Sequence, residues 1–220
     1  CHGGLVLSGG ILDINGDFNF YSNSYSAIND GNIKVAGNWN SSSASIVSFI
    51  GGTLTMDGSA SQTLAMDQNS LLKNLTIASS NSVVTAENDL NIKGDLVINL
   101  EGNFDIGSQN ASLILEGNFI SSGTFASSGE NITFSGSSTV TSAGISDASL
   151  DVVVNKTSNG SVTFLGTCLF DDFTISDGKV AIGSNSVTAD NIFTMQSSTD
   201  LEIGTGTFNS DGEFNAASNA

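Results

Sequence analysis

Carboxylates are the side chains with which this chain could most readily do chemistry. It carries 22 Asp and Glu against five Lys, no Arg and a single His, His2. Asp171 and Asp172 form an adjacent pair, and paired carboxylates carry out glycoside hydrolysis. Neighbouring residues of a β-strand point to opposite faces, so only one of the two could line a given groove. We therefore expect no enzymatic activity, and a polysaccharide lyase or hydrolase is the alternative.

Oxygen-bearing side chains also occupy alternate positions near the start of the chain, at Asp13, Asn15 and Asp17. On one strand these three would share a face and could bind Ca²⁺ together with a neighbouring coil. The run is not an EF-hand loop, because Gly16 falls at its fourth position and that loop requires glycine at the sixth. A Ca²⁺ site and an exposed polar face are the alternatives here, and we expect no other cofactor.

Two cysteines, Cys1 and Cys168, are too few for a disulfide scaffold in a chain of 220 residues. Cys168 falls at an inward apolar position, which favours a buried free thiol. A disulfide between Cys1 and Cys168 and a lipid on Cys1 are the alternatives. Because the chain starts with cysteine and not Met, we expect either a processed N-terminus or an excerpt of a longer chain.

The charge balance excludes several classes of partner. The formal net charge is −17, and only 12% of the residues are charged. Binding to nucleic acid requires Lys and Arg to neutralise phosphates, so we expect no nucleic-acid partner. No apolar run approaches the 18 residues that would span a bilayer, so we expect no membrane insertion.

The elements that position these residues are short strands. Within Ile11–Phe20, apolar Leu12, Ile14, Phe18 and Phe20 alternate with polar residues, which is the period of a half-buried strand. No segment has sustained helical spacing, and Pro, which cannot donate to a β-ladder, is absent. Apolar triplets recur at intervals of roughly 17 to 22 residues and would lie opposite one another in successive coils. They begin at Leu75, Leu96, Leu113, Ile132, Val153, Phe173 and Ile192.

This pattern predicts an all-β fold, a right-handed parallel β-helix (a β-solenoid), with essentially no helix. An antiparallel sandwich is the alternative. We expect one elongated domain over residues 1–220, built of diverged repeats at about 5–95 and 96–172 and a partial repeat at 173–220. Thr53–Leu64 and Asn131–Ser142 match at an offset of 78 residues. Because no capping helix is evident, we expect open ends that self-associate end to end or continue into a longer chain.

The segments Gly58–Leu64 (GSASQTL) and Lys73–Ile77 (KNLTI) resemble the repeats of large secreted surface proteins of Bacteroidota. The resemblance implies a secreted, extracellular or cell-surface location and a structural role as an adhesin stalk or a filament subunit. A carbohydrate-binding module is the alternative function, and a glycan or another surface ligand is the alternative to self-association as a partner. Among the aromatic residues, Trp39, Tyr21 and Tyr25 are the candidates for stacking on a sugar, although packing is the favoured role for Trp39.

Overall fold

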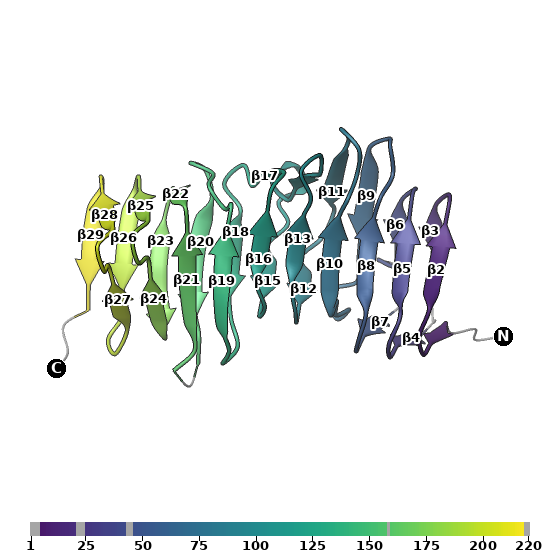
Figure 1. Ribbon diagram of the computed structural model, residues 1–220, viewed down its shortest axis with the longest axis horizontal. Coiled ribbons are helices and arrows are strands. Elements are labelled where there is room, and N and C mark those ends of the chain that lie inside the picture. The colour runs from purple at the N-terminus through teal and green to yellow at the C-terminus, as the bar shows by residue number, and fades with distance from the viewer. Residues whose placement is uncertain (1–4, 21–24, 43–45, 158, 218–220) are drawn as a thin grey trace.

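The computed structural model describes residues 5–20, 25–42, 46–157 and 159–217. These residues form about ten turns of a parallel β-solenoid that are stacked along the long axis of the molecule (Figure 1). The one helical segment among them is the short 3₁₀ turn η1 (Gly107–Gln109). The predicted all-β parallel solenoid is therefore confirmed. Each coil has up to three strands, and the strands stack into three faces.

We number the three faces in the order in which the described chain first reaches them. The second face is formed by a single sheet. It is a sheet of ten parallel strands that receives one strand from each coil. In spatial order these are β2 (Ile11–Ile14), β5 (Asn32–Val35), β8 (Thr53–Met56), β10 (Asn74–Ile77), β13 (Leu96–Ile98), β16 (Phe119–Ser121), β19 (Thr139–Ala143), β21 (Ser161–Leu165), β24 (Lys179–Ala181) and β27 (Asp200–Glu202).

The first face is divided into two sheets. The smaller sheet contains β1 (Val6–Leu7), β4 (Tyr25–Ile28) and β7 (Ile46–Phe49). The larger contains β12 (Leu90–Ile92), β15 (Leu113–Leu115), β18 (Asn131–Phe134), β20 (Asp151–Asn155), β23 (Phe173–Asp177), β26 (Ile192–Met195) and β29 (Glu213–Ala216). Isolated bridges from Ser48 to Leu71 and from Leu72 to Ile92 connect the two sheets.

The third face is divided as well. Its first sheet contains β3 (Phe18–Asn19), β6 (Trp39–Asn40), β9 (Gln62–Ala65), β11 (Val83–Ala86), β14 (Asn103–Asp105) and β17 (Thr124–Ala126). Its second sheet contains β22 (Thr167–Phe170), β25 (Ser186–Ala189) and β28 (Thr207–Ser210). Only the second face therefore runs without interruption along the described chain.

Most coil steps fall within the predicted length, but individual coils depart from it. Trp39 pairs with Leu64, a step of 25 residues, whereas Ser161 pairs with Lys179, a step of 18. The expected ladder of apolar triplets is wrong in two respects. Val153 and Ile192 are one residue out of register, because Ile132 pairs with Val152 and Phe173 with Phe193. Leu96 pairs with Phe119, not with Leu113, which belongs to the first face. Because each coil has three sides, a spacing of about one coil does not by itself identify the side.

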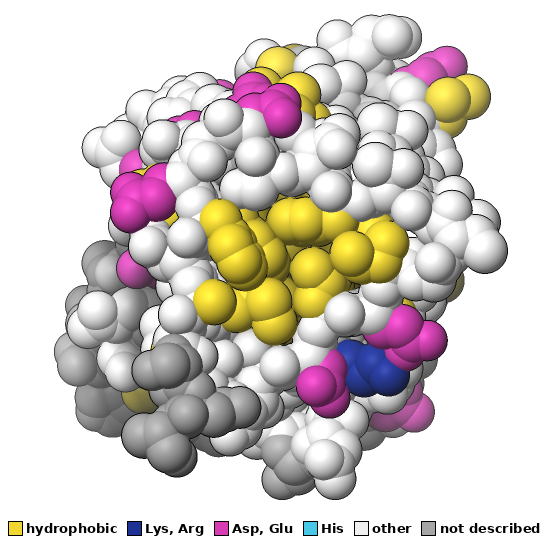
Figure 2. Space-filling view, turned by 90° about the vertical axis from the view of Figure 1, so that its left-hand side faces the viewer, with side chains coloured by type: hydrophobic (Ala, Val, Ile, Leu, Met, Phe, Trp, Pro, Cys, Tyr) yellow, Lys and Arg dark blue, Asp and Glu magenta, His cyan; other side chains and the backbone are white. Residues whose placement is uncertain are grey.

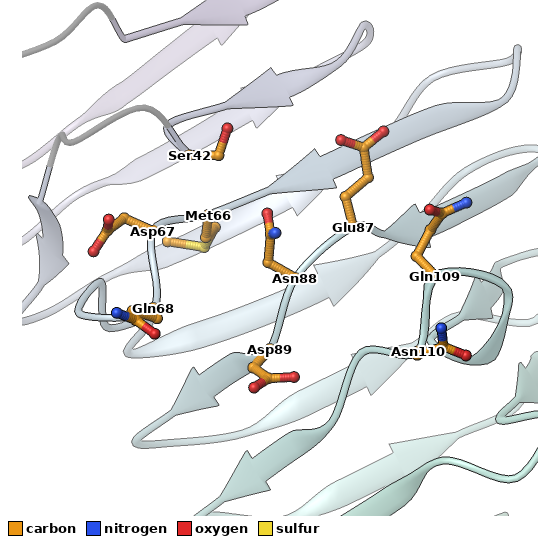
Figure 3. A pocket seen from close by; sticks show the side chains of 9 residues that line it. All are labelled: Ser42, Met66, Asp67, Gln68, Glu87, Asn88, Asp89, Gln109 and Asn110. Carbon is orange, nitrogen blue, oxygen red and sulfur yellow. The ribbon is translucent and has the colours of Figure 1, made fainter.

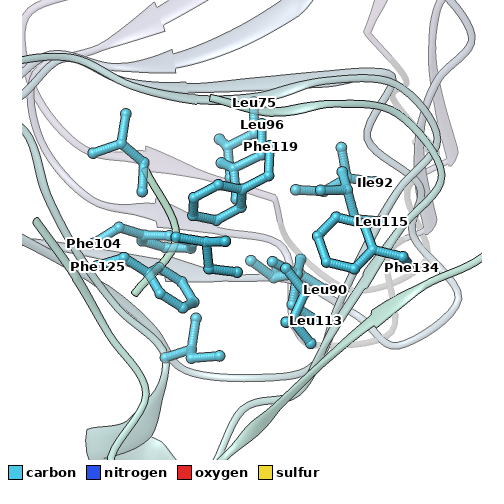
Figure 4. Packing of buried hydrophobic residues seen from close by; sticks show 14 of the residues in the cluster. Leu75, Leu90, Ile92, Leu96, Phe104, Leu113, Leu115, Phe119, Phe125 and Phe134 are labelled. Carbon is cyan, nitrogen blue, oxygen red and sulfur yellow. The ribbon is translucent and has the colours of Figure 1, made fainter. Parts of the chain in front are cut away.

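Alternating burial along each strand builds a single core. In β10 the side chains of Leu75 and Ile77 are buried, while Asn74 and Thr76 between them are half-buried. Leu75, Leu96 and Phe119 form one column inside the solenoid, as Figure 4 shows. Each such residue stabilises the fold by about 1.5–3 kcal/mol when it leaves water. Stacked coils therefore share a core that no coil could form alone.

The candidate sugar-stacking residues do not form a stacking surface in the described structure. Trp39 is 0% exposed, and its Nε1 donates a hydrogen bond to Ser41 Oγ at 3.1 Å. It packs against Phe18 at a centroid distance of 5.0 Å. The favoured packing role of Trp39 is confirmed. Tyr21 and the side chain of Tyr25 lie outside the described residues.

Amide and carboxylate side chains connect the corners of successive coils. Asn74 Oδ1 accepts a hydrogen bond from Asp95 N at 2.9 Å, and Asp95 Oδ1 accepts one from Asn118 N at 2.8 Å. Asn118 Oδ1 in turn accepts one from Thr141 N at 2.8 Å. At the corner before the second face these side chains satisfy backbone donors that no strand pairs. The Asn and Asp content of the chain is thus largely structural at this corner.

Candidate functional site

The residues predicted to bind Ca²⁺ do not share a strand. β2 ends at Ile14, so Asp13 lies on the strand while Asn15 and Asp17 lie in the corner that follows. The expectation of one common strand face is therefore wrong. Asp17 Oδ1 accepts a hydrogen bond from Asn38 N at 2.8 Å, which places Asp17 in a ladder between coils. A Ca²⁺ site at Asp13, Asn15 and Asp17 stays a prediction.

The structure brings together a different set of carboxylates. Asp151, Asp171 and Asp172 each offer an oxygen, and these oxygens all lie within 4.8 Å of one another. Asp171 and Asp172 occupy a bend between β22 and β23 and are both half-buried. The expectation that they point to opposite faces of a strand is wrong, because a bend does not alternate its side chains as a strand does.

Hydrogen bonds give this aspartate cluster a structural role. Asp151 Oδ1 accepts a bond from Asp172 N at 3.2 Å, and Asp172 Oδ1 accepts one from Ile192 N at 3.0 Å. Partial burial is the main cause that raises the pKa of Asp151, and the negative charges of Asp172, Asp171 and Glu130 raise it further. The hydrogen bond from Asp172 N acts in the opposite direction and lowers it. Carboxylate oxygens in this arrangement could hold a hard cation.

Cys168 lies on β22 with its side chain in the core and 1% of its surface exposed. Its predicted inward position is confirmed. Burial raises the pKa of the Cys168 thiol to about 12, so the thiol stays protonated and unreactive at neutral pH. Cys1 lies outside the described residues, and the disulfide between Cys1 and Cys168 stays a prediction.

The C-terminal end of the described solenoid is an open apolar surface. A hollow of about 380 Å³ opens there, and Figure 2 shows a contiguous apolar area at its centre with polar surroundings. Phe193 stacks on Phe214 at a centroid distance of 5.2 Å, and 57% of Phe214 is exposed. We call this surface the C-terminal end face; its apolar members are Phe193, Met195, Leu201, Ile203, Phe208 and Phe214.

The opposite end offers the same kind of surface. Leu5, Leu7, Leu12, Ile14 and Phe18 pack against the core but stay partly exposed. β1, β2 and β3 are the outermost described strands of the three faces at this end, and β29, β27 and β28 are their counterparts at the other. Each end therefore presents strand edges and incompletely covered core residues. Such edges can pair with further strands.

Sequence reasoning missed Lys156, which is 0% exposed at the corner after β20. Its Nζ donates hydrogen bonds to Ser135 O at 2.5 Å and to Glu116 O at 3.0 Å. Burial lowers the pKa of Lys156 to about 8, although nearby Glu116, which also pairs with Lys93, acts to raise it. No sequence signal identifies this lysine, because its burial depends on carbonyl groups from two earlier coils.

Sequence reasoning also missed a polar groove at the corner between the third and first faces. Its volume is about 420 Å³, and segments 66–68, 87–89 and 109–110 line it (Figure 3). A second hollow of about 300 Å³ shares Gln68 and Asp89 with it and extends towards Asn91 and Ile114. The extra residues of the long step between Trp39 and Leu64 lie between β8 and β9, at another corner, so no sequence feature marks this region.

Comparisons with protein families, with curated proteins and with solved structures gave no match for this chain. Within the described residues, no helix has the length and apolar character needed to cross a lipid bilayer. The coils, the three faces and the continuous core define the class of this protein as a parallel β-solenoid of stacked, diverged repeats.

Proposed function

We propose that this chain is a non-enzymatic extracellular structural protein, acting as part of a surface adhesin stalk or as a subunit of a self-assembling filament. The observation that carries the proposal is the apolar surface with unpaired strand edges at each end of the described solenoid, which another copy or further coils of a longer chain would cover. The C-terminal end face leaves 57% of Phe214 exposed, together with the edges of β27, β28 and β29. Elsewhere in the solenoid, each strand of the second face except the first and last has a partner on both sides.

The same interactions that stack coils within the chain would join one chain to the next. Adding a coil pairs three strands and buries apolar residues, and solenoid stability grows through such nearest-neighbour contacts. A second copy could place β1, β2 and β3 against β29, β27 and β28, with the three faces aligned. Contact between two different surfaces is heterologous, so it can continue into a filament.

The extracellular assignment is supported by the resemblance at Gly58–Leu64, for which the structure supplies a physical meaning. Gln62 is 2% exposed, and its Oε1 accepts a hydrogen bond from Gly58 N at 2.9 Å. Its Nε2 donates to Val35 O at 2.9 Å in the preceding coil. The Gln62 side chain thus holds the turn at Gly58 and bonds it to the preceding coil. Such a contact between coils suits a repeat whose role is to extend the solenoid.

The test is the size and shape of the purified chain in solution. We expect concentration-dependent end-to-end assembly by light scattering and rods or fibres by electron microscopy. Phe214→Asp should abolish it, because a charge would be buried in the contact. Leu100→Asp is the matched control, since Leu100 is 79% exposed on a lateral turn. Monomers up to about 1 mM protein, or equal assembly of both variants, would contradict the filament role and leave that of a stalk segment.

A further inference from the structure

We propose that the polar groove is a binding site for a neutral oligosaccharide. The groove lies on the side of the solenoid, remote in sequence from the residues of both ends, so this inference does not depend on end-to-end assembly. It rests on how the groove forms, which groups line it, and which ligands those groups exclude.

The groove exists because the first face is interrupted where it lies. The sheet that ends at β7 and the sheet that begins at β12 are joined there by isolated bridges at Leu71 and Leu72. The coil that follows β9 has only these bridge residues on the first face, and polar side chains occupy the opening beside them (Figure 3).

The chemistry of the lining selects a ligand rich in hydroxyl groups. Three carboxylates, those of Asp67, Glu87 and Asp89, line the groove together with amides such as Asn88 and Gln109. Carboxylates accept hydrogen bonds, amides both donate and accept, and sugar hydroxyls can do both. No lysine is among the lining residues, so an anionic sugar such as a uronate would meet only like charge.

An unsatisfied acceptor adds an independent observation. Asn91 lines the adjoining hollow, and its Oδ1 is buried without any hydrogen-bond partner among the described residues. An amide oxygen in that state costs roughly 1–3 kcal/mol. It is closed off from the open hollow, so a sugar hydroxyl would reach it only if Asn91 turned its amide towards the ligand. Ile114, 41% exposed in the same hollow, offers an apolar contact for the C–H face of a sugar ring.

A single metal ion fits this groove less well than a sugar. Among the described residues, the only three-carboxylate group whose oxygens lie within 4.8 Å is the one at Asp151, so Asp67, Glu87 and Asp89 are too far apart to share one ion. Asp67 Oδ1 and Asp89 Oδ1 also already accept hydrogen bonds from backbone N–H groups, at 2.8 and 2.9 Å.

The test titrates the full chain with neutral hexasaccharides of glucose, mannose and xylose, and with hexagalacturonate as the anionic probe. Binding is followed by calorimetry and by amide shifts in NMR spectra, in buffer with EDTA. The groove variant is Glu87→Ala with Asn88→Ala. Its matched control is Glu101→Ala with Asn99→Ala, the same residue types at exposed positions outside the groove.

We expect at least one neutral hexasaccharide to bind and to shift amides of segments 66–69 and 87–91. The groove variant should weaken this binding by about tenfold or more, while the control variant leaves it unchanged. Three results would overturn the proposal: no neutral probe binding below about 10 mM, equal or tighter binding of hexagalacturonate, or equal weakening by both variants. None of these results bears on the assembly state, which the end-face variants test separately.

Discussion

Replacing the buried Lys156 should change how stability depends on pH. Lys156→Met removes an ammonium group whose Nζ contacts the carbonyl oxygens of Ser135 and Glu116. At neutral pH two effects oppose each other. The variant leaves two buried acceptors without a donor, at roughly 1–3 kcal/mol each, and it relieves the cost of burying a charge. The net change at one pH is therefore less informative than its variation with pH.

The magnitude follows from the pKa of Lys156, which burial lowers from 10.5 to about 8. Between these values the unfolded chain retains a proton that the folded chain has lost, so stability of the parent protein rises with pH. From about pH 7.5 to about pH 9.5 the lysine should contribute a rise of about 2 kcal/mol in the free energy of unfolding, at 1.36 kcal/mol per pKa unit. Lys156→Met cannot contribute this rise.

Urea unfolding of the parent and the variant at these two pH values measures the effect. The difference in unfolding free energy between them should grow by about 2 kcal/mol in favour of the parent at high pH. Lys179→Met is the control: pairing with Glu202 raises the pKa of the exposed Lys179 above 10.5, so its linked loss of stability begins above the assayed window and the difference should stay constant between the two pH values. A difference that stays constant with pH would refute the inference that burial lowers the pKa of Lys156.

Three further predictions concern single side chains. In a Cys1→Ser variant, Cys168 should react with a thiol reagent only as fast as the protein unfolds, because the thiol is buried and its pKa is raised; rapid labelling of the native state would contradict this. Gly52→Ala should lower the free energy of unfolding measured in urea by more than about 3 kcal/mol, since φ is +76° and a Cβ would lie 1.7 Å from a backbone oxygen. Gly129→Ala is the comparison: φ is +96° but the space around it is open, so the loss should be about 1–2 kcal/mol. Asp151→Asn should raise stability at pH 7 by less than about 1 kcal/mol, because partial burial and neighbouring negative charges disfavour the charged carboxylate and raise its pKa. The gain should vanish near about pH 3, where the Asp151 carboxyl is protonated. Equal gains at both pH values would contradict an unfavourable charge at Asp151.

The sequence suffices for the fold class because the relevant signal is local. Alternating burial in strands such as Asn74–Ile77 appears directly as alternating residue types. The same signal cannot assign a strand to a face. Leu113 looks equivalent to Leu96, but one lies on the first face and the other on the second. Register between coils depends on corner lengths, and these differ from coil to coil.

The candidate sites are less accessible to sequence reasoning because they depend on contacts between coils. Asp171 and Asp172 approach Asp151 only because their bend stacks on the start of β20 in the preceding coil. Lys156 is buried by carbonyl groups 21 and 40 residues earlier in the chain. The polar groove lies where the two sheets of the first face meet only through isolated bridges, and no residue pattern in the sequence predicts such an interruption.

The offset of 78 residues has a geometric consequence for the surface. β8 lies on the second face, but the matching β18 lies on the first, because 78 residues span about three coils and two further sides. Inward residues survive this rotation, since Leu54 and Ile132 are both buried. Outward residues do not: Glu87 corresponds to Leu165 at that offset. Duplication therefore copies the core and not the polar groove, and so the oligosaccharide titration should saturate at one site per chain.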